Sequence, residues 1–128
     1  MNYVDLIAVL SIVQLIFFAV LVGRARGVYG IKAPAVSGHE LFERAYRVQM
    51  NTLELMVVFL PALFIAAKYW PAAFVASAGV VYLLGRFIYW RSYVADPASR
   101  GLGFGLSMLP ILVLLAAALA GIVRTGMS

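Results

Sequence analysis

Four runs of apolar residues, each close to the length of a membrane-spanning helix, dominate this sequence of 128 residues. A helix needs about 20 apolar residues to cross the hydrocarbon core of a bilayer. Hydrophobic residues form 65% of the chain, against about 45–50% in soluble domains. A soluble domain this small could not bury that surplus, because small domains bury a smaller share of their surface. The sequence therefore predicts an all-α membrane protein whose outer surface faces lipid or other subunits.

Polar breaks that contain proline or glycine divide the chain, residues 1–128, into the four helices of a single domain. The expected helices cover about residues 3–22, 39–68, 72–94 and 103–123. The stretch from Gly23 to Glu40 is expected to be a loop, and Pro61 is expected to kink the second helix. The pattern predicts a four-helix bundle in the membrane.

The ten basic residues are distributed unevenly between the two ends of this predicted bundle. Eight of them belong to the first and third connections and the adjoining helix ends: Arg24, Arg26, Lys32, Arg44, Arg47, Arg86, Arg91 and Arg100. Only Lys68 and Arg124 belong to the opposite end. The positive-inside rule then predicts that both termini lie outside the cytoplasm and that the basic end faces it.

The second predicted helix carries polar side chains where an apolar helix would be expected. Arg47, Asn51 and Glu54 are spaced i, i+4 and i+7, which places them on one helical face, with Arg44 one turn earlier. Ionisable groups at membrane depth are costly unless they are paired or solvated, so they usually face the bundle interior or a wet cavity. This face is interpreted either as a binding site or as a structural ladder of salt bridges.

The third predicted helix presents a matching stripe, which consists of Tyr82, Arg86, Tyr89 and Tyr93. The alternative interpretation is an aromatic belt at the membrane boundary with a snorkelling arginine. For Phe87 and Trp90 the belt is the favoured interpretation. For Tyr89 and Tyr93 both interpretations, an aromatic belt and a binding site, stay open, because these residues share their stripe with an arginine.

The polar inventory of these two faces indicates what they could bind. Arginine forks match carboxylates, Glu54 could receive an ammonium group, and Asn51 offers both a donor and an acceptor. A phosphate ligand would be repelled by Glu54. No metal site is predicted, because His39 is the only histidine and has no nearby ligand partner. The chain has no cysteine, so any thiol chemistry must come from a bound molecule.

Two sequence blocks carry a family resemblance that covers nearly the whole chain. The stretch from Phe42 to Glu54 contains the pattern E-R-x-x-R-x-Q-x-N-x-x-E. The block VYLLGRFIYWRSY from Val81 to Tyr93 is followed seven residues later by Arg100. Both blocks resemble the MAPEG family, the membrane-associated proteins in eicosanoid and glutathione metabolism.

This resemblance implies a homotrimer that binds glutathione as co-substrate in sites between neighbouring subunits, open to the cytoplasm. The residues that would hold glutathione by resemblance are Arg26, Arg47, Gln49, Asn51, Glu54, Tyr89 and Tyr93. Arg100 matches the arginine that activates the glutathione sulfur. Without the resemblance, an anchoring role at the membrane surface would be preferred for Arg100.

The implied function is a membrane-bound glutathione transferase acting on lipophilic electrophiles, with peroxidase activity towards lipid hydroperoxides as an extension. Leukotriene-synthesising members have an arginine where this chain has Gly27 and a tyrosine where it has Leu55, which argues against leukotriene synthesis. The main alternative is a non-catalytic lipid-binding protein of the same family. A transporter or channel subunit is disfavoured, because the first and fourth helices lack polar residues through the midplane.

Overall fold

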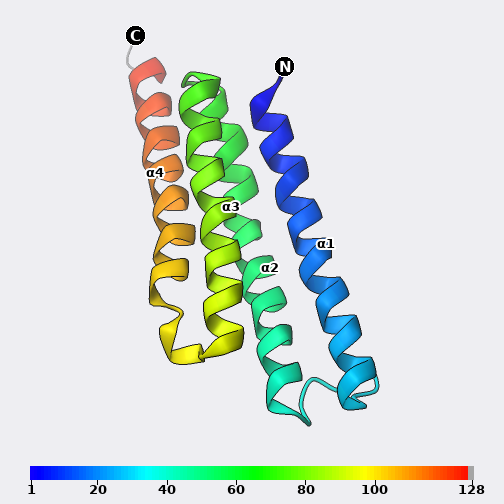
Figure 1. Ribbon diagram of the computed structural model, residues 1–128. Helices are drawn as coiled ribbons and strands as arrows, with labels where there is room; N and C mark the ends of the chain where they lie inside the picture. The colour runs from blue at the N-terminus through cyan, green and yellow to red at the C-terminus, as the bar shows by residue number, and fades with distance from the viewer. Residues whose placement is uncertain (127–128) are drawn as a thin grey trace.

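The computed structural model describes residues 1–126, and four long helices make up most of them (Figure 1). The elements in chain order are α1 (Tyr3–Tyr29), α2 (Glu40–Ala67), α3 (Ala72–Ala95), the short 3-10 helix η1 (Pro97–Ser99) and α4 (Gly101–Gly126). All four long helices are long and apolar enough to cross a membrane. The expected four-helix architecture is thereby confirmed.

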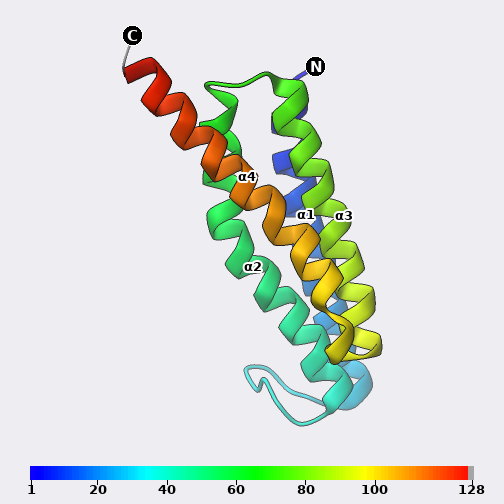
Figure 2. The same cartoon turned by 90° about the vertical axis from the view of Figure 1, so that its left-hand side faces the viewer.

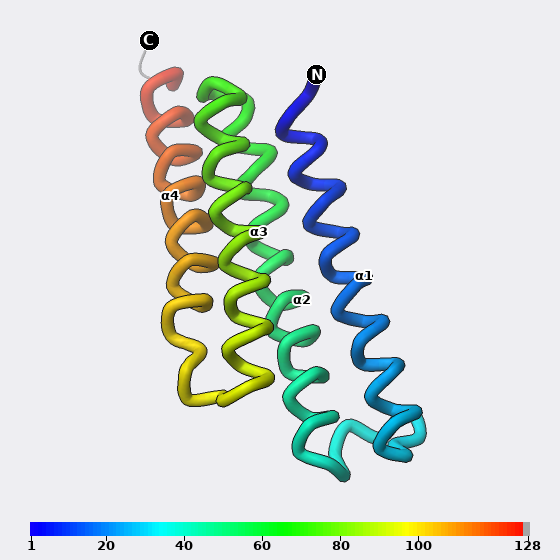
Figure 3. The backbone as a smooth tube through the Cα atoms, in the orientation of Figure 1, coloured from blue at the N-terminus to red at the C-terminus, as the bar shows by residue number. Residues whose placement is uncertain are grey.

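The two termini lie at one end of the bundle, and the α1–α2 connection and η1 lie at the other (Figures 1 and 3). The turn between α2 and α3 is at the end with the termini. Figure 2 shows that α4 runs obliquely, so that its C-terminal part diverges from α3. The predicted basic connections are therefore together at the end opposite the termini.

The prediction that α1 ends near Val22 is wrong, because the helix continues to Tyr29. The apolar run does end there, but Arg24 and Arg26 are good helix formers and no proline follows before Gly30. α1 stops at Gly30, whose φ of 71° is the left-handed conformation that glycine adopts readily, and whose N–H bonds to the carbonyl of Arg26. Hydropathy marks the end of the apolar segment and not the end of the helix.

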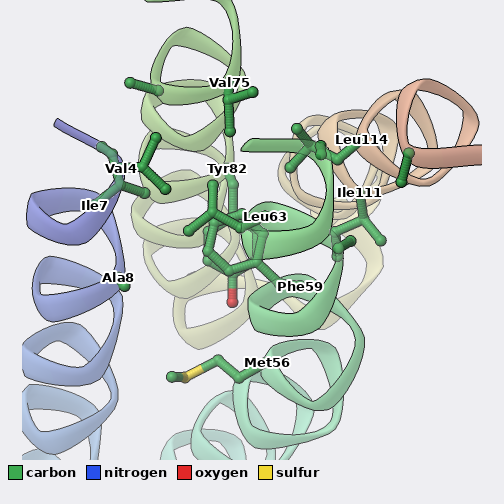
Figure 4. Packing of buried hydrophobic residues seen from close by; sticks show 14 of the residues in the cluster. Val4, Ile7, Ala8, Met56, Phe59, Leu63, Val75, Tyr82, Ile111 and Leu114 are labelled. Carbon is green, nitrogen blue, oxygen red and sulfur yellow. The ribbon is translucent and has the colours of Figure 1, made fainter. Parts of the chain in front are cut away.

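The core is formed by residues from all four long helices (Figure 4). Within it the ring of Tyr82 stacks on the ring of Phe59, with centroids 3.8 Å apart. Only 33–39% of the most apolar window of each helix is buried inside the chain. The remaining apolar side chains point outward, as expected for a surface that meets lipid or other subunits.

Helices α3 and α4 approach each other most closely at two glycines. A Cβ added to Gly85 would lie 2.6 Å from the carbonyl carbon of Leu106, and one added to Gly103 would collide with the backbone of Tyr89. Small residues at a helix interface let the backbones come close, which is a common means of packing helices in membranes. This contact places the start of α4 directly against Tyr89.

Substituting Gly103 by alanine is expected to lower the free energy of unfolding by about 1–3 kcal/mol, because the methyl group has no space against the Tyr89 backbone. Thermal unfolding of the detergent-purified protein would measure the change. Gly105→Ala is the matched control, since a Cβ at that position meets nothing within 4 Å. Equal unfolding temperatures for the two variants would show that the close α3–α4 contact does not limit stability.

Candidate functional site

A pocket of about 540 Å³ is lined by residues from the first half of α2, the last part of α3 and the start of α4. Its lining residues are Arg47, Asn51, Tyr89, Tyr93, Arg100 and Phe104. Five of the eight residues expected to form a site therefore surround one pocket, although they come from α2, α3 and the residue before α4. Phe104 is the one lining residue that was not among the expected site residues.

The start of α4 is held by a compact turn that places Arg100 at the rim of this pocket. Asp96 caps η1 by accepting the N–H of Ala98 at 3.1 Å. The Ser99 hydroxyl donates to the carbonyls of Ser92 and Asp96, at 3.1 and 2.7 Å. The Arg100 guanidinium is exposed and bonds only to the carbonyl of Pro97 among residues 1–126, at 3.1 Å. It remains able to bind an anion in the pocket.

The two arginines at the start of α2 have different surroundings. Arg44 forms an ion pair with Glu40 and donates to the carbonyls of Val94 and Ala95, at 2.9 and 3.2 Å. Arg44 therefore ties α2 to the end of α3. Arg47 is exposed, lines the pocket and makes no ion pair with the described part of the chain. The salt-bridge interpretation thus holds for Arg44 and not for Arg47.

The aromatic stripe of α3 forms one wall of the pocket. Tyr89 is 3% exposed and Tyr93 is half-buried, and their rings stack with centroids 5.5 Å apart. A belt tyrosine would instead have its ring at the lipid surface. The structure places both rings at the pocket, whereas Phe87 is exposed on the outside of the bundle.

Arg86 belongs to the same stripe, and the alternative interpretation of a snorkelling arginine is wrong. The residue is 0% exposed, because Gly85 and Ser107 bring α4 close over this part of α3. The guanidinium lies over the Tyr89 ring, 4.4 Å from its centroid. Its position on the stripe was the sequence signal for burial. The sequence signal for Phe104 as a lining residue was its position one helical turn after Arg100.

Three of the expected site residues lie outside the pocket lining. Arg26 donates to the carbonyl of Ala35 at 2.7 Å and lies over the Phe42 ring. Gln49 is half-buried elsewhere on α2. Glu54 is exposed and forms no ion pair within residues 1–126. The single chain thus brings together Arg47, Asn51, Tyr89, Tyr93 and Arg100, and leaves Arg26, Gln49 and Glu54 outside the pocket.

The lining chemistry favours an anionic ligand. Two guanidinium groups, one amide and two phenols surround the space, and none of the six lining residues is a carboxylate. Guanidinium forks bind carboxylates in bidentate geometry, and they stabilise a thiolate more strongly in a site shielded from water. The pocket is therefore suited to a ligand that carries carboxylates or a developing negative charge.

Comparisons with known proteins agree with the two sequence blocks. The MAPEG family model matches residues 4–120. A microsomal glutathione S-transferase 2 from Homo sapiens is 38% identical over 113 residues, which are 87% of this chain and 77% of that protein. An uncharacterized protein from Synechocystis is 41% identical over 91% of this chain and 85% of its own length. Leukotriene C4 synthase from Cavia porcellus is 32% identical over 92% and 83%. The chain is therefore a multi-pass membrane protein that belongs to the MAPEG family.

Proposed function

We propose that this protein is a membrane-bound glutathione transferase that ionises the thiol of bound glutathione for attack on lipophilic electrophiles. The observation that carries this proposal is the pocket that Arg47, Asn51, Tyr89, Tyr93 and Arg100 surround. The similarity to microsomal glutathione S-transferases 2, at 34–38% identity, supports the choice of glutathione. The substrate supplies the sulfur, since the chain has no cysteine.

In the proposed reaction Arg100 stabilises the glutathione thiolate, and the thiol proton passes to solvent. A free thiol has a pKa of about 8.5, and a neighbouring guanidinium lowers that pKa because it favours the charged form. The thiolate then attacks the electrophilic carbon of the second substrate. A carbon–sulfur bond forms, and the bond to the leaving group breaks with its electron pair, as when an aryl halide loses halide.

Peroxidase activity is proposed as an extension of the same thiolate chemistry. The thiolate attacks the terminal oxygen of a lipid hydroperoxide, and the O–O bond breaks to release the lipid alcohol. A second glutathione then reduces the sulfenic acid of the first, giving glutathione disulfide and water. Two electrons from two thiols reduce one peroxide, so the reaction balances without any group from the protein.

A homotrimer with its sites between subunits completes the proposal. Glu54 supports it, because an exposed carboxylate on a membrane helix needs a partner, and residues 1–126 supply no ion-pair partner. A neighbouring subunit could bring Arg26 and Gln49 to the ligand, and Glu54 could then bind the ammonium group. The basic end, with the pocket, is proposed to face the cytoplasm, with both termini on the other side. Native mass spectrometry in detergent would measure the number of subunits.

The decisive experiment uses the purified protein in detergent. Glutathione binding, thiolate absorbance and conjugation of an aryl halide would be measured on one preparation, and reduction of a lipid hydroperoxide in parallel. We expect saturable binding, thiolate absorbance at neutral pH and conjugate formation. A protein that binds fatty acids but neither glutathione nor its sulfonate analogue would be a lipid-binding protein and not a transferase. Glutathione binding without thiolate would exclude the proposed role of Arg100.

A further inference from the structure

A layer of polar side chains lies between the candidate site and the apolar core. Its members come from α2, α3 and α4 and are Asn51, Thr52, Arg86 and Ser107. The layer precedes the core residues Leu55 on α2 and Ile111 on α4, and it follows the core residue Tyr82 on α3. Thr52, Arg86 and Ser107 are each 0% exposed. A buried polar layer in a membrane helix bundle is costly unless its groups are satisfied by hydrogen bonds, and polar groups at this depth usually have a function.

Arg86 is the centre of this layer. Its Nε donates to Ser107 Oγ at 2.8 Å, and its Nη1 donates to Asn51 Oδ1 at 2.7 Å and to Thr52 Oγ1 at 3.2 Å. The hydroxyls of Ser107 and Thr52 in turn donate hydrogen bonds to the carbonyls of Gly103 and Val48. No carboxylate pairs with Arg86 within residues 1–126. Nε and Nη1 are thus held by neutral acceptors, of which only Asn51 lines the pocket, while Nη2 is buried without a hydrogen-bond partner in residues 1–126.

The bond from Arg86 determines which way the Asn51 amide points. An arginine has no acceptor, so only the carbonyl oxygen of the amide can face it. The amino group, Nδ2, is then the other end of the amide, and it makes no hydrogen bond within the described chain. We propose that Arg86 is a positioning residue, which holds Asn51 so that its N–H groups point to the ligand in the pocket.

The orientation of the Asn51 amide determines which part of a ligand it recognises. With its carbonyl oxygen directed to Arg86, Asn51 acts as a donor and selects a carbonyl or carboxylate oxygen. In terms of the proposed function, on which this inference rests, Asn51 binds an oxygen of the glutathione backbone and not its ammonium group. Arg86 also lies over Tyr89, so one buried cation fixes two of the six lining residues.

The first test needs no ligand, because the chain contains only two asparagines, Asn2 and Asn51. Protein labelled with ¹⁵N-asparagine should show two side-chain amide pairs, assigned with Asn2→Asp. We expect Arg86→Met to shift the Asn51 pair and to leave the Asn2 pair unchanged. An Asn51 pair that does not move would overturn the proposal, whether or not glutathione binds.

The second test is Asn51→Asp, which keeps the shape of the side chain and an acceptor for Arg86. The variant should fold with at least wild-type thermal stability, since the buried cation gains a charged partner. It should nevertheless raise KM for glutathione by about tenfold to a hundredfold, because the donor facing the ligand has become an acceptor. Unchanged or lower KM would show that Asn51 does not donate to the ligand.

Ser11→Ala supplies the matched control, because it removes a buried hydroxyl of α1 that bonds to the Ala8 carbonyl and does not line the pocket. We expect Arg86→Met to raise KM for glutathione by about tenfold, with Ser11→Ala within about threefold of wild type, both assayed below their unfolding temperatures. Arg86→Lys should restore part of the loss. Equal KM values for Arg86→Met and Ser11→Ala would reduce Arg86 to a structural role and overturn the proposal. Wild-type protein that binds no glutathione would refute the proposed function, while the amide spectrum would still decide the Arg86–Asn51 contact.

Discussion

Replacing Arg100 by alanine is expected to slow conjugation about a hundredfold at pH 6.5, because only about 1% of a thiol with a pKa of 8.5 is ionised there. The guanidinium at the rim of the pocket would lower the pKa of the bound thiol, so that the wild-type protein is expected to hold thiolate at that pH. The difference should shrink as pH rises, since the variant gains thiolate up to about pH 8.5 and the wild type gains little. A pH–rate profile at saturating glutathione, together with thiolate absorbance, measures this.

Arg91→Ala is the matched control for Arg100→Ala. Arg91 is also an exposed arginine near the same end of the bundle, but it lies over the Trp90 ring and does not line the pocket. Its removal should leave the pH–rate profile unchanged. If Arg100→Ala and the wild type had superimposable profiles, or if Arg91→Ala had the same effect, a specific role of Arg100 in ionising the thiol would be refuted.

Replacing Arg47 by alanine is expected to raise KM for glutathione about a hundredfold and to change kcat far less. Arg47 lines the pocket and has no ion pair within residues 1–126, so its fork is available for a ligand carboxylate. Loss of a charge-assisted hydrogen bond costs about 1.5–3 kcal/mol, which corresponds to about ten- to a hundredfold in affinity, and a bidentate pair lies at the upper end. Steady-state kinetics across glutathione concentrations would separate KM from kcat.

The neighbouring Arg44 provides the comparison within the same helix. Its guanidinium is committed to Glu40 and to the carbonyls at the end of α3. Arg44→Ala should therefore lower the unfolding temperature while KM for glutathione stays near the wild-type value. A large KM effect of Arg44→Ala with little effect of Arg47→Ala would mean that the ligand is held on a different face of α2.

The polar residues of α1 show how much of the side-chain packing can be predicted from local sequence. Ser11 and Gln14 interrupt an otherwise apolar run, and the structure buries both. The expectation that the first helix lacks polar residues through its middle is therefore wrong. Ser11 donates to the carbonyl of Ala8, and the Gln14 amide donates to the carbonyl of Leu83 on α3 at 3.0 Å. That polar groups turn inward follows from the lack of hydrogen-bond partners in lipid. Which carbonyl Gln14 meets depends on the packing of α1 against α3, which spacing within α1 does not contain.

The sequence by itself determined the four membrane helices, the basic end and the shared face of Arg47 and Asn51. Hydropathy and helical periodicity are local properties, so they can be read without a fold. Only the tertiary structure decided that Arg44 ties α2 to α3 while Arg47 lines the pocket, and that Arg86 is buried beside Asn51. The physical reason is that these outcomes depend on contacts between helices far apart in the chain. The packing of α2 against α3 sets the partners of Arg44 and Arg86, and the close contact of α3 and α4 at Gly85 and Gly103 brings Ser107 to Arg86.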